Sequence, residues 1–166
     1  MNYHKIEKLS VANGTGIRVV LWVSGCRLYC KNCQNPQTWS FQSGKPFDET
    51  AKQELFEALD KPYIQGITFS GGHPLEPENV ETVINLAKEI KEKFPTKDIW
   101  LYTGYLYEEL YYRRISRILL YIDVLIDGEF IEEQKDLTLK WRGSKNQRVI
   151  DVKETLKQGK IILYCD

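Results

Sequence analysis

The sequence has little of what marks a membrane protein or a nucleic-acid-binding protein. Its apolar runs fall well short of the roughly 20 residues that a bilayer-crossing helix needs, and no signal-like apolar segment follows the start. Lys and Arg together number 23, as do Asp and Glu, so the chain has no excess positive charge for a large phosphate footprint. We therefore expect a cytoplasmic protein with neither a membrane nor a nucleic acid as its partner.

The chain also lacks the features that separate domains, because it has no internal repeat, low-complexity tract or Gly/Ser-rich linker. A chain of 166 residues can bury one hydrophobic core without disulfides or a structural metal. It is shorter than the roughly 250 residues of a complete eightfold βα barrel. We expect one domain spanning residues 1–166.

Cysteine is scarce but unevenly distributed. Three of the four cysteines lie within eight residues: Cys26, Cys30 and Cys33. In a chain without an export signal, this spacing indicates soft-metal ligation or redox chemistry rather than disulfides. Structural zinc usually takes four ligands, whereas an iron–sulfur cluster held by three cysteines keeps one iron open. A zinc site completed from a distance by Cys165, His4 or His73 is the alternative.

Strand-like and helix-like segments alternate along most of the chain. Apolar runs rich in β-branched and aromatic residues predict strands at residues 17–23, 64–69, 99–102 and 122–126. Apolar residues at helical spacing predict helices at residues 48–60, from Pro77 onward and near residues 108–120. The less regular last third predicts short strands at residues 137–141, 147–152 and 161–164, with a helical turn at 152–157. The alternation is typical of an α/β fold with parallel βαβ units, whose ligands bind at the carboxyl ends of the strands.

Candidate site residues follow these strands. Gly71 and Gly72 allow a backbone to approach a ligand closely, but a Gly-Gly pair taken alone favours the alternative, a plain turn between a strand and a helix. His73 is a candidate ligand or base, with a loop-bonded imidazole as the alternative. Asp127 ends a strand, where a carboxylate can accept hydrogen bonds from ribose hydroxyls or simply belong to a turn.

The loop from Asn13 to Arg18 places two glycines beside an arginine, an arrangement that can cradle an anion. It lacks the length and residue order of a phosphate-binding loop, and a strand rather than a helix follows it. A loop that packs near the cysteines is the alternative.

The residues around the cysteines, NGTGIRVVLWVSGCRLYCKNCQNPQTW, resemble the signature of radical S-adenosylmethionine enzymes that activate glycyl-radical enzymes. The segments LYTGY, DVLIDGEF and KWRGSKNQRVID are similar to the branch of this family that activates anaerobic ribonucleoside-triphosphate reductase. The alternatives are an activating enzyme for another glycyl-radical enzyme, such as pyruvate formate-lyase, and a zinc or iron–sulfur module without enzymatic activity.

The resemblance implies a partial, open (βα) barrel in which Cys26, Cys30 and Cys33 hold a [4Fe-4S] cluster and the open iron binds S-adenosylmethionine. It also implies that the cofactor contacts Gly71, Gly72, His73, Thr103 and Asp127. Two residues depart from the family pattern. His73 stands where an acid is usual, and Asn32 stands where many members have an aromatic residue.

The reaction implied by the resemblance is reductive cleavage of S-adenosylmethionine, with electrons from reduced flavodoxin or a similar donor. The resulting radical would take a hydrogen atom from a glycine of the partner reductase, which would enter through the open side of the barrel. The polar segment from Trp141 to Arg148 is expected to shape the edge that faces the partner or the cofactor.

Overall fold

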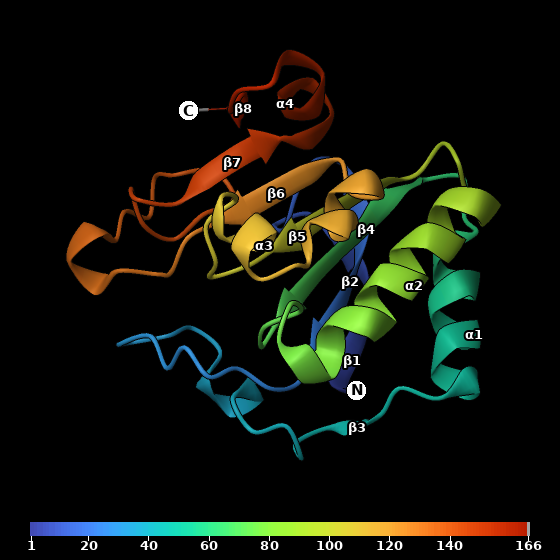
Figure 1. Cartoon of the computed structure of the whole chain (residues 1–166). Coiled ribbons are helices and arrows are strands. Elements are labelled where there is room, and N and C mark those ends of the chain that lie inside the picture. The colour runs from blue at the N-terminus through green and yellow to red at the C-terminus, as the bar shows by residue number, and fades with distance from the viewer. Residues whose placement is uncertain (166) are drawn as a thin grey trace.

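Eight strands form one sheet in the computed structural model, which describes residues 1–165 (Figure 1). The strands are β1 (Asn2–Ser10), β2 (Ile17–Val23), β3 (Lys45–Pro46), β4 (Ile64–Gly71), β5 (Asp98–Tyr102), β6 (Val124–Asp127), β7 (Arg148–Asp151) and β8 (Leu163–Cys165). The α-helices are α1 (Glu49–Leu59), α2 (Pro77–Lys93), α3 (Glu109–Tyr112) and α4 (Val152–Gln158). Three short 3₁₀ helices lie at Pro36–Thr38, Ser116–Leu120 and Glu132–Gln134.

The strand order is β3-β1-β2-β4-β5-β6-β7-β8. Strands β2, β4, β5 and β6 are parallel, and the strands outside them pair antiparallel. The predicted α/β class and its parallel core are therefore confirmed. The sheet runs from β3 to β8 without closing, and the expected partial barrel is not confirmed. The carboxyl ends of the four parallel strands meet at one edge of the sheet, which positions the loops that follow them.

Helices α1 and α2 lie side by side against one face of the sheet (Figure 1). Alternate residues of each strand point to that face, so Leu21, Phe69 and Leu101 are fully buried against the apolar faces of the helices. Fully burying a side chain of this size contributes roughly 1.5–3 kcal/mol. Helix α1 begins at the predicted place because the Asp48 side chain accepts a hydrogen bond from Ala51 N at 2.9 Å.

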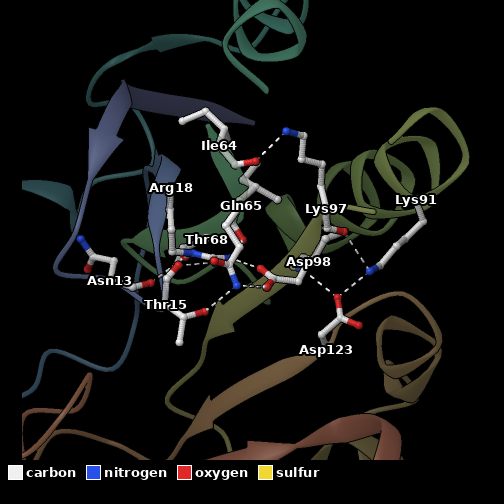
Figure 2. A network of polar contacts seen from close by, with 12 residues as sticks. Asn13, Thr15, Arg18, Ile64, Gln65, Thr68, Lys91, Lys97, Asp98 and Asp123 are labelled. Atoms are coloured by element: carbon white, nitrogen blue, oxygen red, sulfur yellow. Dashed lines mark hydrogen bonds and ion pairs between the residues drawn. The ribbon is translucent and has the colours of Figure 1, made fainter. Parts of the chain in front are cut away.

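A buried ion pair lies on the opposite face of the sheet (Figure 2). The Arg18 side chain is fully buried, and its Nη2 lies 2.6 Å from Asp98 Oδ1. Arg18 Nε donates to Thr68 Oγ1 at 2.9 Å, and the guanidinium lies 5.2 Å from the centre of the Trp100 ring. Burial lowers the pKa of Arg18, against the opposing effect of Asp98. Arg18 thus joins β2, β4 and β5 instead of serving the anion cradle considered from the sequence.

The structure differs from the predicted elements in three places. Strand β1 was not predicted, because only Tyr3 and Ser10 of its residues are buried and no apolar alternation results. The helix predicted near residues 108–120 is wrong: it divides into α3 and a 3₁₀ helix, with Arg114 between them at a positive φ of 59°. The strand predicted at residues 137–141 is also wrong, since Leu137 is exposed and Trp141 has a φ of 61°.

The predictions for the short C-terminal elements lie closer to the structure. Strand β7 and helix α4 lie within the predicted ranges 147–152 and 152–157 to within one residue at each boundary. Strand β8 is shifted toward the C-terminus of its predicted range. Among residues 1–165, no helix is both long enough and apolar enough to cross a bilayer.

Candidate functional site

A cavity of about 410 Å³ opens beyond the carboxyl ends of the parallel strands. Its lining includes all the candidate residues taken from the sequence except Asp127: Cys26, Cys30, Cys33, Gly71, Gly72, His73 and Thr103. These residues come from three loops that are far apart in the sequence, after β2, β4 and β5. The fold therefore brings the predicted cysteine loop and the predicted Gly-Gly-His turn into one site.

The cysteine loop is held by its own backbone. Gly25 N donates to Thr38 O at 2.7 Å, and Cys26 N donates to Trp39 O at 3.0 Å, so the loop returns to the end of β2. All three cysteines are free thiols. Burial raises the pKa of Cys26 to about 11 and also raises the pKa of Cys30. A cation that binds these sulfurs must therefore displace thiol protons.

The three thiols fit a cluster better than a single ion. Within residues 1–165, no three His, Cys, Asp or Glu side chains are grouped closely enough to hold one metal ion. A cubic cluster spaces its thiolate ligands more widely than one ion does, and it needs three cysteines when one iron stays open. Of the distant ligands that zinc would require, Cys165 packs against the Trp100 cluster and His4 Nε2 lies 2.8 Å from Ser43 Oγ. His73 does line the same cavity as the cysteines, but its Nε2 lies 2.7 Å from Thr103 Oγ1.

The Gly-Gly turn packs directly on the cysteine loop. Gly72 N donates to Val23 O at 2.8 Å, and His73 N donates to Gly25 O at 2.8 Å. A Cβ on Gly72 would lie 2.8 Å from Gly25 O and 3.0 Å from Thr38 O, both of which are backbone atoms. Gly71 has a φ of 104°, which other residues rarely adopt. These glycines are required for the approach of two loops of the protein itself, an explanation that the sequence did not suggest.

His73 is buried, with 2% of its surface exposed. Its Nε2 lies 2.7 Å from Thr103 Oγ1, and its ring packs edge-on against Tyr105 at 4.4 Å between ring centres. Its Nδ1 lies 3.8 Å from Glu76 Oε2, which is beyond hydrogen-bond distance, and is buried without a partner in the described chain. The imidazole thus fixes Thr103 at the cavity wall through Nε2, while Nδ1 has no hydrogen-bond partner in the described chain.

Glu76 is a buried acid that sequence reasoning missed. Its carboxylate accepts a hydrogen bond from Arg27 N at 2.6 Å, directly after Cys26. Burial acts to raise the pKa of Glu76, but His73 and Arg27 outweigh burial and hold that pKa below its ordinary value. The family's usual acid is absent at position 73, and this carboxylate three residues later connects the same turn to the cysteine loop. The only signal in the sequence was its place just before Pro77, at the start of a helix.

Asp127 lies outside the cavity lining. Its side chain is fully buried, and its Oδ2 accepts hydrogen bonds from Tyr107 N at 2.8 Å and from Arg148 Nη2 at 2.6 Å. The next residue, Gly128, does line the cavity. The structure therefore gives Asp127 a role in holding the end of β6, and its predicted contact with a cofactor stays a prediction.

Comparison with known proteins agrees with this site. Residues 12–150 match the family model described as a 4Fe-4S single cluster domain. The chain is 48% identical over 149 residues to the anaerobic ribonucleoside-triphosphate reductase-activating protein of Haemophilus influenzae, covering 89% of this chain and 96% of that protein. The chain belongs to this family of activating proteins. Members from Enterobacteria phage T4 and Escherichia coli are 45% and 42% identical, over 90% of this chain and 93% and 97% of their own lengths.

In this member of the activating-protein family, the segment from Trp141 to Arg148 divides into two parts. Trp141, Arg142, Gly143 and Gln147 line the cavity. Tyr102 Oη donates to Trp141 O at 2.5 Å, which holds the segment over the sheet. Arg148 instead faces Asp127 and Glu108, at 2.6 Å and 2.9 Å. Arg142 therefore lines the cavity and Arg148 does not, and the expected role of this segment at the edge that faces the partner or the cofactor stays a prediction.

Proposed function

We propose that this protein activates an anaerobic ribonucleoside-triphosphate reductase by forming a glycyl radical on it. In this proposal, S-adenosylmethionine is cleaved reductively at a [4Fe-4S] cluster held by Cys26, Cys30 and Cys33. The observation that carries the proposal is that three free thiols and the Gly-Gly-His turn line one cavity, in a chain that matches a single-cluster 4Fe-4S domain. When bound, the cluster and S-adenosylmethionine would supply the one-electron chemistry that gives methionine and a 5'-deoxyadenosyl radical.

The residues of the chain have distinct tasks in this proposal. Three thiolates hold the cluster and leave its fourth iron for the amino and carboxylate groups of S-adenosylmethionine. The backbone of Gly72 and His73 holds the cysteine loop against the end of β4. Thr103 Oγ1 is kept in place by Tyr105 N, which donates to it at 3.1 Å, and by His73, so that its hydroxyl is positioned at the cavity wall. These contacts fix the cavity before any ligand enters, which reduces the ordering cost of binding.

The partner is inferred from the relatives, whose names assign them to anaerobic ribonucleoside-triphosphate reductase. The substrate within the partner would be a glycine residue. Because the reaction needs one electron for each cleavage, a reductant such as reduced flavodoxin is part of the proposal. An activating role toward pyruvate formate-lyase is the alternative enzyme function, and it predicts the same cluster with a different partner.

Anaerobic reconstitution with iron and sulfide tests the proposal. The reconstituted protein should bind iron and sulfide in equal amounts, release 5'-deoxyadenosine when reduced in the presence of S-adenosylmethionine, and produce a glycyl radical on the reductase, seen by electron paramagnetic resonance. Pyruvate formate-lyase serves as the parallel partner. Zinc in place of iron would overturn the cluster, and a radical on pyruvate formate-lyase alone would overturn the choice of partner.

A further inference from the structure

Glu76 is an acid buried behind the cysteine loop. Only 3% of its surface is exposed, and it does not belong to the lining of the cavity. Its Oε2 accepts the hydrogen bond from the backbone N of Arg27, the residue that follows Cys26, at 2.6 Å. Burying a carboxylate is unfavourable unless hydrogen bonds or cations compensate its charge. The retention of an acid at this place therefore needs an explanation beyond the packing of the turn.

Two residues at the beginning of α2 hold the backbone on both sides of Cys26. Asn79 Nδ2 donates to Ser24 O at 2.9 Å on one side of the cysteine. Glu76 Oε2 accepts from Arg27 N on the other side. Asn79 is fully enclosed, with 1% of its surface exposed. The position of the Glu76 carboxylate relative to the cysteine loop is thus fixed by the fold.

The charge of Glu76 is only partly compensated within residues 1–165. The cation paired with it is Arg27, whose Nη1 lies 3.5 Å from Glu76 Oε1. The same guanidinium binds Glu78 more closely, at 2.8 Å and 2.6 Å through its two terminal nitrogens. His73 Nδ1 approaches Glu76 Oε2 only to 3.8 Å, which is beyond hydrogen-bond distance. One arginine therefore faces two carboxylates, and a net negative charge remains beside the cysteine loop.

The two carboxylates differ in their access to solvent. The side chain of Glu78 is 46% exposed, so water and salt screen its charge. Glu76 is buried, where the effective dielectric constant is lower and a charge acts more strongly on its surroundings. Burial opposes the ionisation of Glu76, but His73 and Arg27 keep its pKa below its ordinary value, so it is charged at neutral pH. Glu76 is thus the acid of this pair whose charge acts on the cysteine loop.

We propose that Glu76 is a positioning residue for the bound cluster and that its buried charge lowers the reduction potential of that cluster. This inference rests on the proposed function, because it takes a [4Fe-4S] cluster as the group that the three cysteines hold. Reduction adds an electron to the cluster, and a fixed negative charge nearby disfavours the added charge. A lower potential makes the reduced cluster a stronger one-electron donor to the sulfonium of S-adenosylmethionine.

An anaerobic redox titration of the reconstituted protein without S-adenosylmethionine tests the inference, with the electron paramagnetic resonance signal of the reduced cluster as the readout. Glu76→Gln removes the charge but keeps an oxygen that can accept from Arg27 N. At a fixed potential it should raise the ratio of reduced to oxidised cluster about tenfold, which is a rise of about 59 mV for a one-electron couple. Its iron content should stay at the parental value. Glu76→Asp keeps the charge, so its potential should stay closer to that of the parental protein.

Two further variants act on the same arginine. Glu78→Gln is the matched control, because it removes an acid from Arg27 at an exposed position. Its potential should shift much less than that of Glu76→Gln, since solvent already screens the charge. Arg27→Gln keeps the backbone N–H and removes the cation, so the potential should fall instead of rising. If Glu76→Gln does not fold, the Arg27 variant carries the test.

The two proposals fail in different ways. If the parental protein takes up zinc and forms no iron–sulfur cluster, the proposed function is wrong. If the parental protein forms the cluster and cleaves S-adenosylmethionine, while Glu76→Gln has the parental potential, only the present inference is wrong. Equal shifts in Glu76→Gln and Glu76→Asp would also overturn it, because the geometry of the loop and not the charge would then set the potential. A potential at or above the parental value in Arg27→Gln would overturn it as well.

Discussion

Asp127 and Arg148 face each other directly across the antiparallel strands β6 and β7. Arg148 Nη2 lies 2.6 Å from Asp127 Oδ2, and Arg148 Nε donates to Oδ1 at 3.1 Å. The Asp127 side chain is fully buried, whereas 28% of the Arg148 side chain is exposed and also meets Glu108. The pair fixes the end of β6 at the point where Gly128 enters the cavity wall.

Replacing one or the other member of this ion pair should lower the free energy of unfolding by different amounts. Arg148→Gln should lower the free energy of unfolding by about 3 kcal/mol, because it leaves a buried carboxylate without its cation. Asp127→Asn should cost less, about 1–2 kcal/mol, since Arg148 keeps Glu108 and water as partners. Urea unfolding of the two variants measures the difference. A larger loss in Asp127→Asn would contradict this account of the pair.

The same two variants decide whether Asp127 also touches the cofactor. If the carboxylate acts only through Arg148, both variants should lose S-adenosylmethionine affinity to a similar extent while keeping their iron. A clearly greater loss in Asp127→Asn would mean that the carboxylate itself contacts the ligand, as the family resemblance implies.

The cysteines give a second prediction. Cys26→Ala, Cys30→Ala and Cys33→Ala should each abolish cluster binding and activation, because a cluster with one iron open needs all three thiolates. Cys165→Ala should keep both, since Cys165 pairs with Val149 in the sheet and lies outside the cavity lining. Iron and sulfide analysis after anaerobic reconstitution is the measurement. Loss of iron in the Cys165 variant would show that the three-ligand assignment is wrong.

How much of the fold the sequence predicts depends on how completely each element is buried. Strands β2, β4 and β5 are buried on both faces and read as continuous apolar runs, so their positions are clear from local sequence. Strand β1 pairs antiparallel with β2 and leaves most of its residues partly or fully exposed, so no pattern identifies it. The helix near residues 108–120 fails because Arg114 turns the chain at a positive φ, which no residue type there signals.

The site residues, too, can be predicted only where the signal lies in the local sequence. The three cysteines lie within eight residues and the two glycines are adjacent, so each motif can be recognised from local sequence. Arg142 and Arg148 are equivalent in sequence, two arginines in one polar stretch, and only the pairing of β6 with β7 separates them. That pairing gives Arg148 to Asp127 and leaves Arg142 in the cavity wall. Glu76 could not be predicted as a site residue, because its contact with Arg27 spans 49 positions of the chain.

Gly72 gives a third prediction. Gly72→Ala should lower the free energy of unfolding by about 2–3 kcal/mol and reduce iron incorporation, because the added methyl meets the backbone of Gly25 and Thr38. Gly104→Ala is the matched control within the cavity lining, since the atoms nearest to its methyl belong to the side chains of Leu28 and Glu129 and not to the backbone. Gly104→Ala should lower the free energy of unfolding by less than about 1 kcal/mol. Equal unfolding energies in the two variants would contradict the packing of the turn on the cysteine loop.

His73 gives a fourth prediction. His73→Ala should weaken S-adenosylmethionine binding by roughly 1 kcal/mol or less, since the imidazole positions Thr103 and the backbone contact of residue 73 is kept. Thr103→Val removes the same hydrogen bond from the other side and should have a similar effect. Titration of both variants, with iron content as the control, makes the comparison. Complete loss of binding in His73→Ala with the cluster intact would mean that the imidazole itself is a ligand contact.

The last prediction concerns pH and an acid far from the cavity. Asp123 connects three elements. Its Oδ2 accepts a hydrogen bond from Lys91 Nζ at 2.5 Å (Figure 2) and another from Ile99 N at 2.8 Å. Its Oδ1 lies 2.8 Å from Lys153 Nζ. Burial acts to raise the pKa of Asp123, but the hydrogen bonds from Lys153, Lys91 and Ile99 outweigh burial and hold that pKa below its ordinary value.

A carboxyl whose pKa is lower in the folded protein stabilises the fold fully above its unfolded pKa of about 3.9 and loses that contribution as the pH falls through the folded value. Asp123→Asn should therefore be less stable than the parental protein by about 1–3 kcal/mol at neutral pH, and the gap should narrow below about pH 4. Urea unfolding of both proteins from neutral pH to about pH 3 measures the gap. Asp60→Asn, at an exposed carboxylate, is the control for replacing an acid. A gap that stays constant down to the lowest pH would show that the charge of Asp123 contributes nothing to stability.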